Sequence, residues 1–385
     1  MILRCLCIAL FCLVNGSNLS AQEAEALQLH KGINLSSWLA NAQRQPLYER
    51  DFAQIKHAGF DNVRLPITPE RLGFALDKNA PIDRPLDAAA LDNAVILATH
   101  NGLAVVIDVH PDAAFMKTLE QESWAEQQFI HLWIAIAKHY KGYPAKTVAF
   151  ELLNEPQYYG SESRYHAFLQ TLVASIRKED STRWIIAGAP HGSSIEGLQG
   201  MVPLSDDHIL YDFHFYEPYI VTHQGIGHGF ETKMIRYFRD VPYPALLVNQ
   251  DSVLYAPNAS DPAQAKSELE AYVNAQWNAP HIADRVRQAR QWADKYNVPV
   301  ICGEFGVLRN HIKPESRYRW IADTRTALEA NNIGWQLWDY TDMFGIAALV
   351  GETQTDPVDG SVKFIHPEAG FRLIELQALK ALGLQ

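Results

Sequence analysis

The chain alternates short apolar runs with longer amphipathic segments, and this alternation constrains its fold more than any other feature. The apolar runs have the length and composition of buried β-strands: Gly32–Ser36, Asn62–Leu65, Ala104–Val109, Thr147–Leu152, Arg183–Ala187, His208–Phe213, Val298–Gly303 and Gly334–Trp338. Apolar residues recur at helical spacing in the segments between them: Leu47–His57, Asp87–His100, Trp124–Tyr140, Ser163–Lys178, Ile282–Tyr296 and Tyr318–Ala330. Strands that alternate with helices pair in parallel, and eight of them favour a closed (β/α)8 barrel over an open doubly wound sheet.

The chain has 385 residues, which is more than the roughly 250 residues of a plain (β/α)8, or TIM, barrel. A long insertion after the sixth strand, Glu217–Pro280, holds most of the excess and is rich in aromatic residues: Tyr219, Phe230, Tyr237, Phe238, Tyr243, Tyr255, Tyr272 and Trp277. We expect most of these rings to form a stabilising core and the insertion to wall a groove. Without a linker rich in Pro, Ser or Thr, residues 22–385 are expected to form a single α/β domain.

The N-terminal segment Met1–Ala21 has one basic residue, an apolar run and then a polar stretch, as is typical of a secretory signal peptide. Its apolar run is too short to span a bilayer. We therefore expect an exported protein, periplasmic or secreted, without a membrane anchor. Three of the four cysteines lie in this segment, so the mature chain would keep Cys302 alone and have no internal disulfide. We interpret Cys302 as a small core residue.

Charge and motifs exclude several function classes. The formal net charge of −11 becomes −12 when Arg4 is removed with the signal peptide, which argues against nucleic acid and anionic membranes as partners. The chain has no Gly-x-Gly-x-x-Gly after its first strand and no phosphate loop, which lowers the case for nucleotides. Its 15 histidines include no His-Glu-x-x-His, so we expect no metal and no cofactor.

Polar side chains follow most of the predicted strands at the point where each strand ends. The fourth strand ends in Asn154-Glu155-Pro156 and the seventh in Glu304. Arg64, His110, His214, Tyr216 and Trp338 occupy the corresponding positions after the second, third, sixth and eighth strands. The carboxyl ends of the strands of an α/β barrel open onto one face, so these side chains are expected to converge there.

Two nearby residues compete with these candidates. Glu151 lies four positions before Glu155, inside the fourth strand, and we assign it a structural role. Trp335 and Trp338 should face opposite sides of the eighth strand, with only Trp338 reaching its end. Asp339 and Asp342 follow the same strand and are further candidates for contacts with a ligand.

The strand-end residues resemble the signature of glycoside hydrolase family 5, the cellulase and mannanase family, from about Gly32 to Asp339. The resemblance implies that Glu155 is the general acid/base and Glu304 the nucleophile. It also implies roles in holding the sugar and the nucleophile for a further set: Arg64 supporting the nucleophile, Asn154 bonding the sugar 2-hydroxyl, His110 and His214 shaping the cleaved subsite, Tyr216 orienting Glu304 and Trp338 forming the stacking floor.

Glycoside cleavage needs one protonated and one ionised carboxyl group. Arg64 beside Glu304 would favour its charged form, and that charge would in turn raise the pKa of Glu155. The two carboxyl groups should then be separated by roughly 5 Å, the retaining geometry.

The sequence therefore predicts a retaining β-glycosidase that acts as a monomer on a β-glucan or related polysaccharide, most simply an endo-β-1,4-glucanase. Members of the family that the chain resembles share the catalytic residues but cleave different glycans, and the long insertion could close one end of the groove and make the enzyme exo-acting. A mannanase or an exo-β-1,3-glucanase is therefore the alternative within the family. From a different class, a polysaccharide-binding or secretion accessory barrel without turnover is also compatible with the sequence. The presence of both glutamates, with Arg64, His214 and Tyr216, argues against that interpretation.

Overall fold

The computed structural model describes residues 27, 29–36, 47–226, 234–248, 254–255, 262–350, 353–355, 362–364 and 371–385. The expected signal peptide, residues 1–21, lies outside these ranges. So do Phe230 and the side chain of Tyr255 in the insertion.

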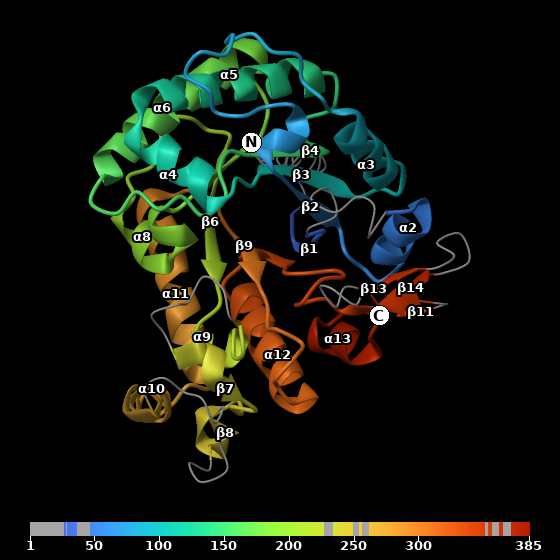
Figure 1. The fold of residues 1–385 in the computed structure, drawn as a ribbon, viewed down its shortest axis with the longest axis vertical. Helices are drawn as coiled ribbons and strands as arrows, with labels where there is room; N and C mark the ends of the chain where they lie inside the picture. The colour runs from blue at the N-terminus through green and yellow to red at the C-terminus, as the bar shows by residue number, and fades with distance from the viewer. Residues whose placement is uncertain are drawn as a thin grey trace, which may run out of the picture.

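The expected barrel is confirmed: eight parallel strands close in the order β1-β10-β9-β6-β5-β4-β3-β2 (Figure 1). They are β1 (Lys31–Asn34), β2 (Asn62–Ile67), β3 (Ala104–Val109), β4 (Val148–Glu151), β5 (Ile185–Gly188), β6 (Ile209–Phe215), β9 (Val300–Phe305) and β10 (Gly334–Leu337). All eight fall on the segments expected from the apolar runs, with small differences at their ends.

The six expected helices are also present: α2 (Glu49–His57), α3 (Ala89–His100), α5 (Ser123–Tyr140), α6 (Glu162–Glu179), α11 (Ala279–Tyr296) and α12 (Pro314–Ala330). Sequence periodicity missed the other α-helices of the described ranges: α4 (Ala113–Gln121), α7 (Pro190–Ser193), α8 (Ile195–Gly200), α9 (Tyr219–Thr222), α10 (Pro262–Asn274) and α13 (Leu376–Ala381). Short 3-10 turns complete the helical segments: η1 (Pro69–Leu72), η2 (Met234–Tyr237) and η3 (Ala245–Leu247). None of the helices in the described ranges is both long and apolar enough to cross a membrane.

Strand alternation divides the interior into two parts. On β3, Val105 and Ile107 face outward and pack with the helices in the main core, whereas Ala104 and Val106 face the lumen of the barrel. The lumen-facing residues at the amino ends of the strands form a separate apolar group, here called the lumen plug: Leu29, Ala104, Val106, Ala149, Ile186 and Ile301. Cys302 is buried in the main core, as expected, and burial raises the pKa of its thiol.

The described residues of the insertion extend the main core. Phe238, Tyr243 and Tyr272 are buried and belong to the same apolar cluster as the barrel helices. The hydroxyl of Tyr243 donates to Asp323 on α12 at 2.8 Å, which fixes the insertion to the barrel. Its described elements, β7 (Phe238–Arg239), β8 (Leu254–Tyr255) and α10, lie together beyond α9 at the bottom of the view in Figure 1.

A C-terminal addition that the sequence pattern did not indicate packs beside α2. Strands β11 (Ala347–Val350) and β14 (Phe371–Ile374) form an antiparallel pair, and β12 (Thr353–Thr355) and β13 (Val362–Phe364) form another. Arg372 on β14 is buried and contacts Asp51 on α2 at 3.0 Å. This ion pair connects the end of the chain to its first barrel helix.

Candidate active site

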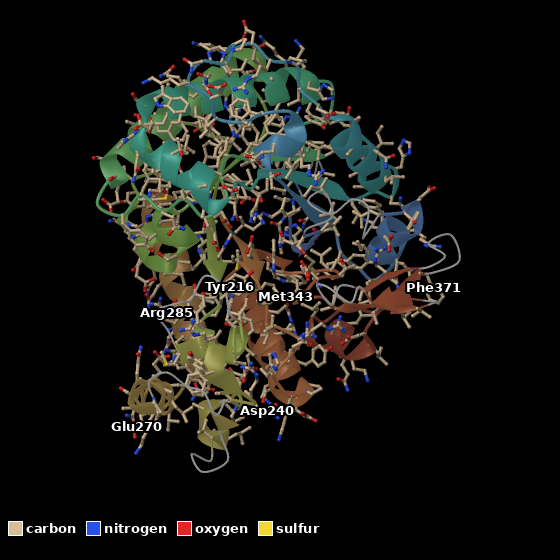
Figure 2. The ribbon with its side chains drawn as sticks, in the orientation of Figure 1. Tyr216, Asp240, Glu270, Arg285, Met343 and Phe371 are labelled. Atoms are coloured by element: carbon tan, nitrogen blue, oxygen red, sulfur yellow. The ribbon has the colours of Figure 1, made fainter. Side chains whose placement is uncertain are left out.

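The structure brings all the predicted site residues into one contact network at the carboxyl ends of the barrel strands. Arg64 on β2 reaches both Glu304 on β9 and Asn154 after β4. Glu155 contacts His214 on β6, and Tyr216 just after β6 contacts Glu304. The remaining two, His110 after β3 and Trp338 after β10, stack on each other with ring centroids 5.9 Å apart. In Figure 2, Tyr216 marks this end of β6.

A β-bulge in β9 turns Glu304 into the lumen. Ile301 faces the lumen, so simple alternation would point Glu304 toward the helices. The pairing with β6 skips Gly303: Phe213 pairs with Cys302 and His214 with Glu304. The extra residue reverses the alternation and aims the carboxylate inward. Only glycine fits here, because a Cβ on Gly303 would collide with the Asp212 carboxylate that accepts its backbone N–H at 2.6 Å.

Glu304 is almost fully buried, at 4% exposure, and its two oxygens have different partners. Arg64 Nη1 donates to Oε1 at 2.7 Å, and the Tyr216 hydroxyl donates to Oε2 at 2.8 Å. Burial and the Glu304 charge raise the pKa of Tyr216 well above its usual value, so its hydroxyl stays a donor. A cation and a fixed donor together stabilise an ionised carboxylate.

Glu155 is in a more open environment. Its backbone has a positive φ of 43°, and its side chain is 41% exposed. Its Oε1 lies 2.9 Å from His214 Nδ1. Burial raises the pKa of Glu155, but the hydrogen bond and charge of His214, together with the charges of His110 and Arg64, outweigh burial and leave the pKa below its ordinary value. The expectation of a raised pKa for Glu155 was therefore wrong for the unliganded site, because sequence reasoning did not place His214 against this carboxylate.

His214 lies between the two glutamates. Its Nδ1 is 2.9 Å from Glu155 and 3.5 Å from Glu304, and its Nε2 is 3.2 Å from Asp212 Oδ2. Burial disfavours the imidazolium, but the charges of Glu304 and Asp212 more than offset this and raise the pKa of His214 well above its usual value. The ring can thus hold a proton next to Glu155.

Arg64 is held in place by Glu151, for which the sequence predicted a structural role, and by Asn34 and Asp108, which the sequence analysis did not single out. Glu151 accepts from Nε at 2.7 Å and from Nη2 at 2.6 Å, a bidentate pair on a completely buried guanidinium. Asn34 Oδ1 accepts from Nη1 at 2.9 Å, and Asp108 lies 3.0 Å from Nη2. Burial raises the pKa of Glu151 to about 7, although the charge of Arg64 opposes this. The structural role expected for Glu151 is therefore to orient Arg64.

We call the charged and polar residues at this end of the lumen the lumen network: Asn34, Arg64, Asp108, Glu151, Asp212 and His214. Strand alternation could have identified them, because Asp108, Glu151 and Asp212 each lie two residues beyond a lumen-facing apolar position of the same strand.

Some of the other candidates lie beside the two glutamates, and others are buried away from them. The Asn154 amide is oriented by Arg64, which donates to Oδ1 at 2.8 Å, and its Nδ2 lies 3.1 Å from His110 Nε2. Trp335 is buried against Phe60 and Phe305, on the side of β10 opposite to Trp338, as expected. Asp339 is fully buried and hydrogen-bonded to Ser36, so it does not contact a sugar in this arrangement.

Within the described ranges, two groups of side chains have metal-like spacing: Glu151 with Asp212 and His214, and Glu155 with His214 and Glu304. Both Glu151 oxygens already accept from Arg64, and both Glu304 oxygens accept from Arg64 or Tyr216. We therefore assign no metal to either group. In the second group, a carboxylate oxygen of Glu155 lies within 4.8 Å of one of Glu304.

Comparison with known proteins gives a consistent result. The family model described as cellulase (glycosyl hydrolase family 5) matches residues 19–343. Endoglucanase C of Acetivibrio thermocellus is 31% identical over 326 residues, which cover 81% of this chain and 91% of that protein. Endoglucanase 3 of Fibrobacter succinogenes is 29% identical over 342 residues, 84% of this chain, but the match spans only 51% of that protein.

Solved structures show the same fold. The structure of Thermotoga maritima Cel5A in complex with cellobiose is 24% identical, with a TM-score of 0.68 over 92% of this chain and 97% of that one. The cellulose synthase subunit Z of Clostridioides difficile is also 24% identical, with a TM-score of 0.67 over 92% of this chain and 99% of that one. The family match covers most of the barrel and both strand-end glutamates, and the chain belongs to glycosyl hydrolase family 5 as a cellulase-type O-glycosyl hydrolase.

Proposed function

We propose that this enzyme hydrolyses a β-1,4-linked glucan by double displacement, with retention at the anomeric carbon. Glu304 is the nucleophile and Glu155 the acid/base. The observation that carries the proposal is the short distance between carboxylate oxygens, within 4.8 Å. Retaining enzymes hold their carboxyl groups about 5–5.5 Å apart, whereas inverting enzymes leave room for a water at about 6.5–9.5 Å.

The two carboxylates differ in the way that these roles require. Arg64 and Tyr216 each donate a hydrogen bond to one oxygen of Glu304, which holds this carboxylate in position for attack on the anomeric carbon. Glu155 and His214 form a hydrogen-bonded pair, and the raised pKa of His214 lets the pair hold one proton. Substrate binding excludes water from Glu155, which favours its neutral form and moves that proton onto its carboxyl group.

In the first step, Glu155 gives its proton to the glycosidic oxygen while the bond from that oxygen to the anomeric carbon breaks. A Glu304 oxygen then forms an ester bond to that carbon. In the second step, Glu155 takes a proton from water, and the resulting hydroxide displaces Glu304. Asn154, with its amide fixed by Arg64, is placed to bond the sugar 2-hydroxyl, and Trp338 supplies an aromatic floor backed by His110.

The choice of β-1,4-glucan is supported by the relatives named as endoglucanases, including one that is 31% identical with 91% of its length matched. A panel of reduced-end-labelled oligosaccharides tests it: β-1,4-glucan, β-1,4-mannan and β-1,3-glucan, with wild type beside Glu155→Gln and Glu304→Gln. We expect cleavage of the β-1,4-glucan by wild type alone. Cleavage of only mannan or β-1,3-glucan would replace the substrate, and binding without any cleavage would indicate an accessory barrel.

We also propose that residues 1–21 direct export and are removed, which leaves residues 22–385 as the catalytic domain. N-terminal sequencing of the protein recovered outside the cytoplasm of an expressing bacterium tests this. A chain that starts near residue 22 is expected, and one that keeps Met1 would refute the cleavage.

A further inference from the structure

We propose that Tyr159 and His191 form a binding platform for the leaving-group side of the substrate, stacking on a glucosyl unit that departs in the first step. This proposal rests on the proposed function, because it takes Glu155 to be the residue that protonates the leaving group. It adds a sugar subsite built from the loops after β4 and β5.

The two rings lie almost parallel. Their centroids are 4.5 Å apart and their planes differ by 3°. Tyr159 is a large aromatic residue that lies outside the core, and it is 67% exposed. One face of its ring is covered by His191, so the exposed surface is presented in a fixed orientation. An aromatic face that is held open in this way suits the apolar face of a pyranose ring.

Hydrogen bonds hold the platform in place. His191 Nε2 lies 2.7 Å from Glu162 Oε1, the same oxygen that accepts the Gly160 backbone N–H at 3.0 Å. The backbone N–H of His191 donates to Gln157 O at 3.0 Å, and that of Gly192 donates to Pro156 O at 2.9 Å. These bonds join the loop after β4 to the loop after β5, so the two rings move as one unit.

The loop after β4 also keeps the platform close to Glu155. Gln157 Nε2 donates to the backbone carbonyl of Glu155 at 2.8 Å, and Tyr159 follows Glu155 by four residues. Four residues span at most about 14 Å, which is within a few sugar units of the bond that Glu155 protonates.

The order of the strands around the barrel determines on which side of the two glutamates the platform lies. Strand β4 is separated from β10 by three strands in either direction around the closed barrel, so the two strands are opposite each other. Trp338 follows β10, and Tyr159 follows β4. A glucan whose one end stacks on Trp338 and whose scissile bond lies between the two glutamates therefore extends toward Tyr159. In this arrangement, the sugar units of the leaving group contact the platform.

The test compares substrates with and without a sugar leaving group. β-Cellobiosyl fluoride releases fluoride and leaves the platform empty, whereas cellopentaose places glucosyl units on it. The measured quantity is the ratio of kcat/KM for cellopentaose to kcat/KM for the fluoride, which does not depend on the fraction of folded enzyme. Tyr159→Ala is expected to lower this ratio roughly two- to tenfold, the range for one aromatic contact.

Three further variants sharpen the comparison. Tyr159→Phe should keep the wild-type ratio, because the ring remains. His191→Asn removes the backing ring with a residue that tolerates the positive φ of 62° at this position, and it should lower the ratio less than Tyr159→Ala does. Phe371→Ala removes a 44% exposed ring on β14, far from Tyr216 in Figure 2, and should change nothing.

Two failures can be told apart. If Tyr159→Ala gives the same ratio as Phe371→Ala while wild type cleaves both substrates, the platform is refuted and the proposed function stands. If wild type hydrolyses neither the fluoride nor cellopentaose, the proposed function has failed, and the platform with it.

Transglycosylation gives a second readout. Added cellobiose should act as the acceptor of the glycosyl-enzyme less often in Tyr159→Ala than in wild type.

Discussion

The two ends of the barrel lumen are built on the same strands but from opposite chemistry. At the amino ends, the lumen plug consists of apolar side chains such as Val106 and Ala149. Two residues further along the same strands, Asp108 and Glu151 belong to the lumen network around Arg64. Buried charges cost free energy unless they are paired, and even a paired network is seldom more stable than an apolar core. The plug therefore serves stability, and the network serves the geometry of Glu155 and Glu304.

The largest expected effect is at the network end. Glu304→Gln should lower kcat/KM by at least about 10⁴-fold, because an amide cannot form the glycosyl ester. The matched control is Glu270→Gln on α10, whose side chain is 45% exposed and lies far from Tyr216 in Figure 2, and which should retain wild-type activity. Steady-state kinetics on the cleaved oligosaccharide measure both. Substantial turnover by Glu304→Gln would assign the nucleophile elsewhere.

The second effect concerns the residue that orients Arg64. Glu151→Gln replaces a bidentate carboxylate by an amide that can accept only through its oxygen. We expect kcat to fall by about 10- to 100-fold with little change in KM, because Arg64 no longer holds Glu304 in place. A changed pH profile of kcat should accompany the loss. If only thermal stability changed, Glu151 would be a packing residue like those of the plug.

At the lumen plug we expect the opposite pattern, a loss of stability without a loss of activity. Ile186→Ala removes a buried side chain from the lumen plug and should lower the free energy of unfolding by about 2–5 kcal/mol. Below its unfolding temperature, its kcat should stay near that of wild type. Denaturant unfolding and kinetics on the same preparation measure the two quantities. A loss of kcat as large as that of Glu151→Gln would mean that the two ends are not functionally distinct.

The smallest expected effect is the pH dependence of stability that comes from Asp339, just after β10. Burial raises the pKa of Asp339 from 3.8 to about 7, with the Ser36 hydrogen bond opposing the shift. Because its folded-state pKa is raised, the folded protein binds a proton that the unfolded chain releases between these values, so stability falls as pH rises from about 4 to 7. Asp339→Asn should make this decline shallower in urea unfolding at several pH values. An unchanged slope would show that Asp339 does not titrate in this window.

The barrel could be predicted from the sequence because each strand and helix carries its own apolar pattern. Prediction of the six expected helices and eight strands needed no long-range information. The strands β11 and β14 escaped prediction because their short alternating segments resemble loops until they pair with each other.

The sequence predicted which residues form the site, but it did not predict the bulge at Gly303 or the lowered pKa of Glu155. Strand ends identified Glu155 and Glu304, since polar residues there converge on one face of the barrel. The bulge at Gly303, which turns Glu304 inward, depends on the Asp212 carboxylate of the neighbouring strand. The lowered pKa of Glu155 depends on His214, which lies 59 residues away in the sequence. Both are properties of contacts between strands.

We propose that Glu155 and Glu304 act across a short gap as acid/base and nucleophile. Proton NMR during the first minutes of hydrolysis tests it most directly, because it reports the anomer of the new reducing end before mutarotation. With retention, the β-anomer should appear first and the α-anomer should follow slowly. The α-anomer appearing first would mean direct attack by water, and the covalent role of Glu304 would then be wrong.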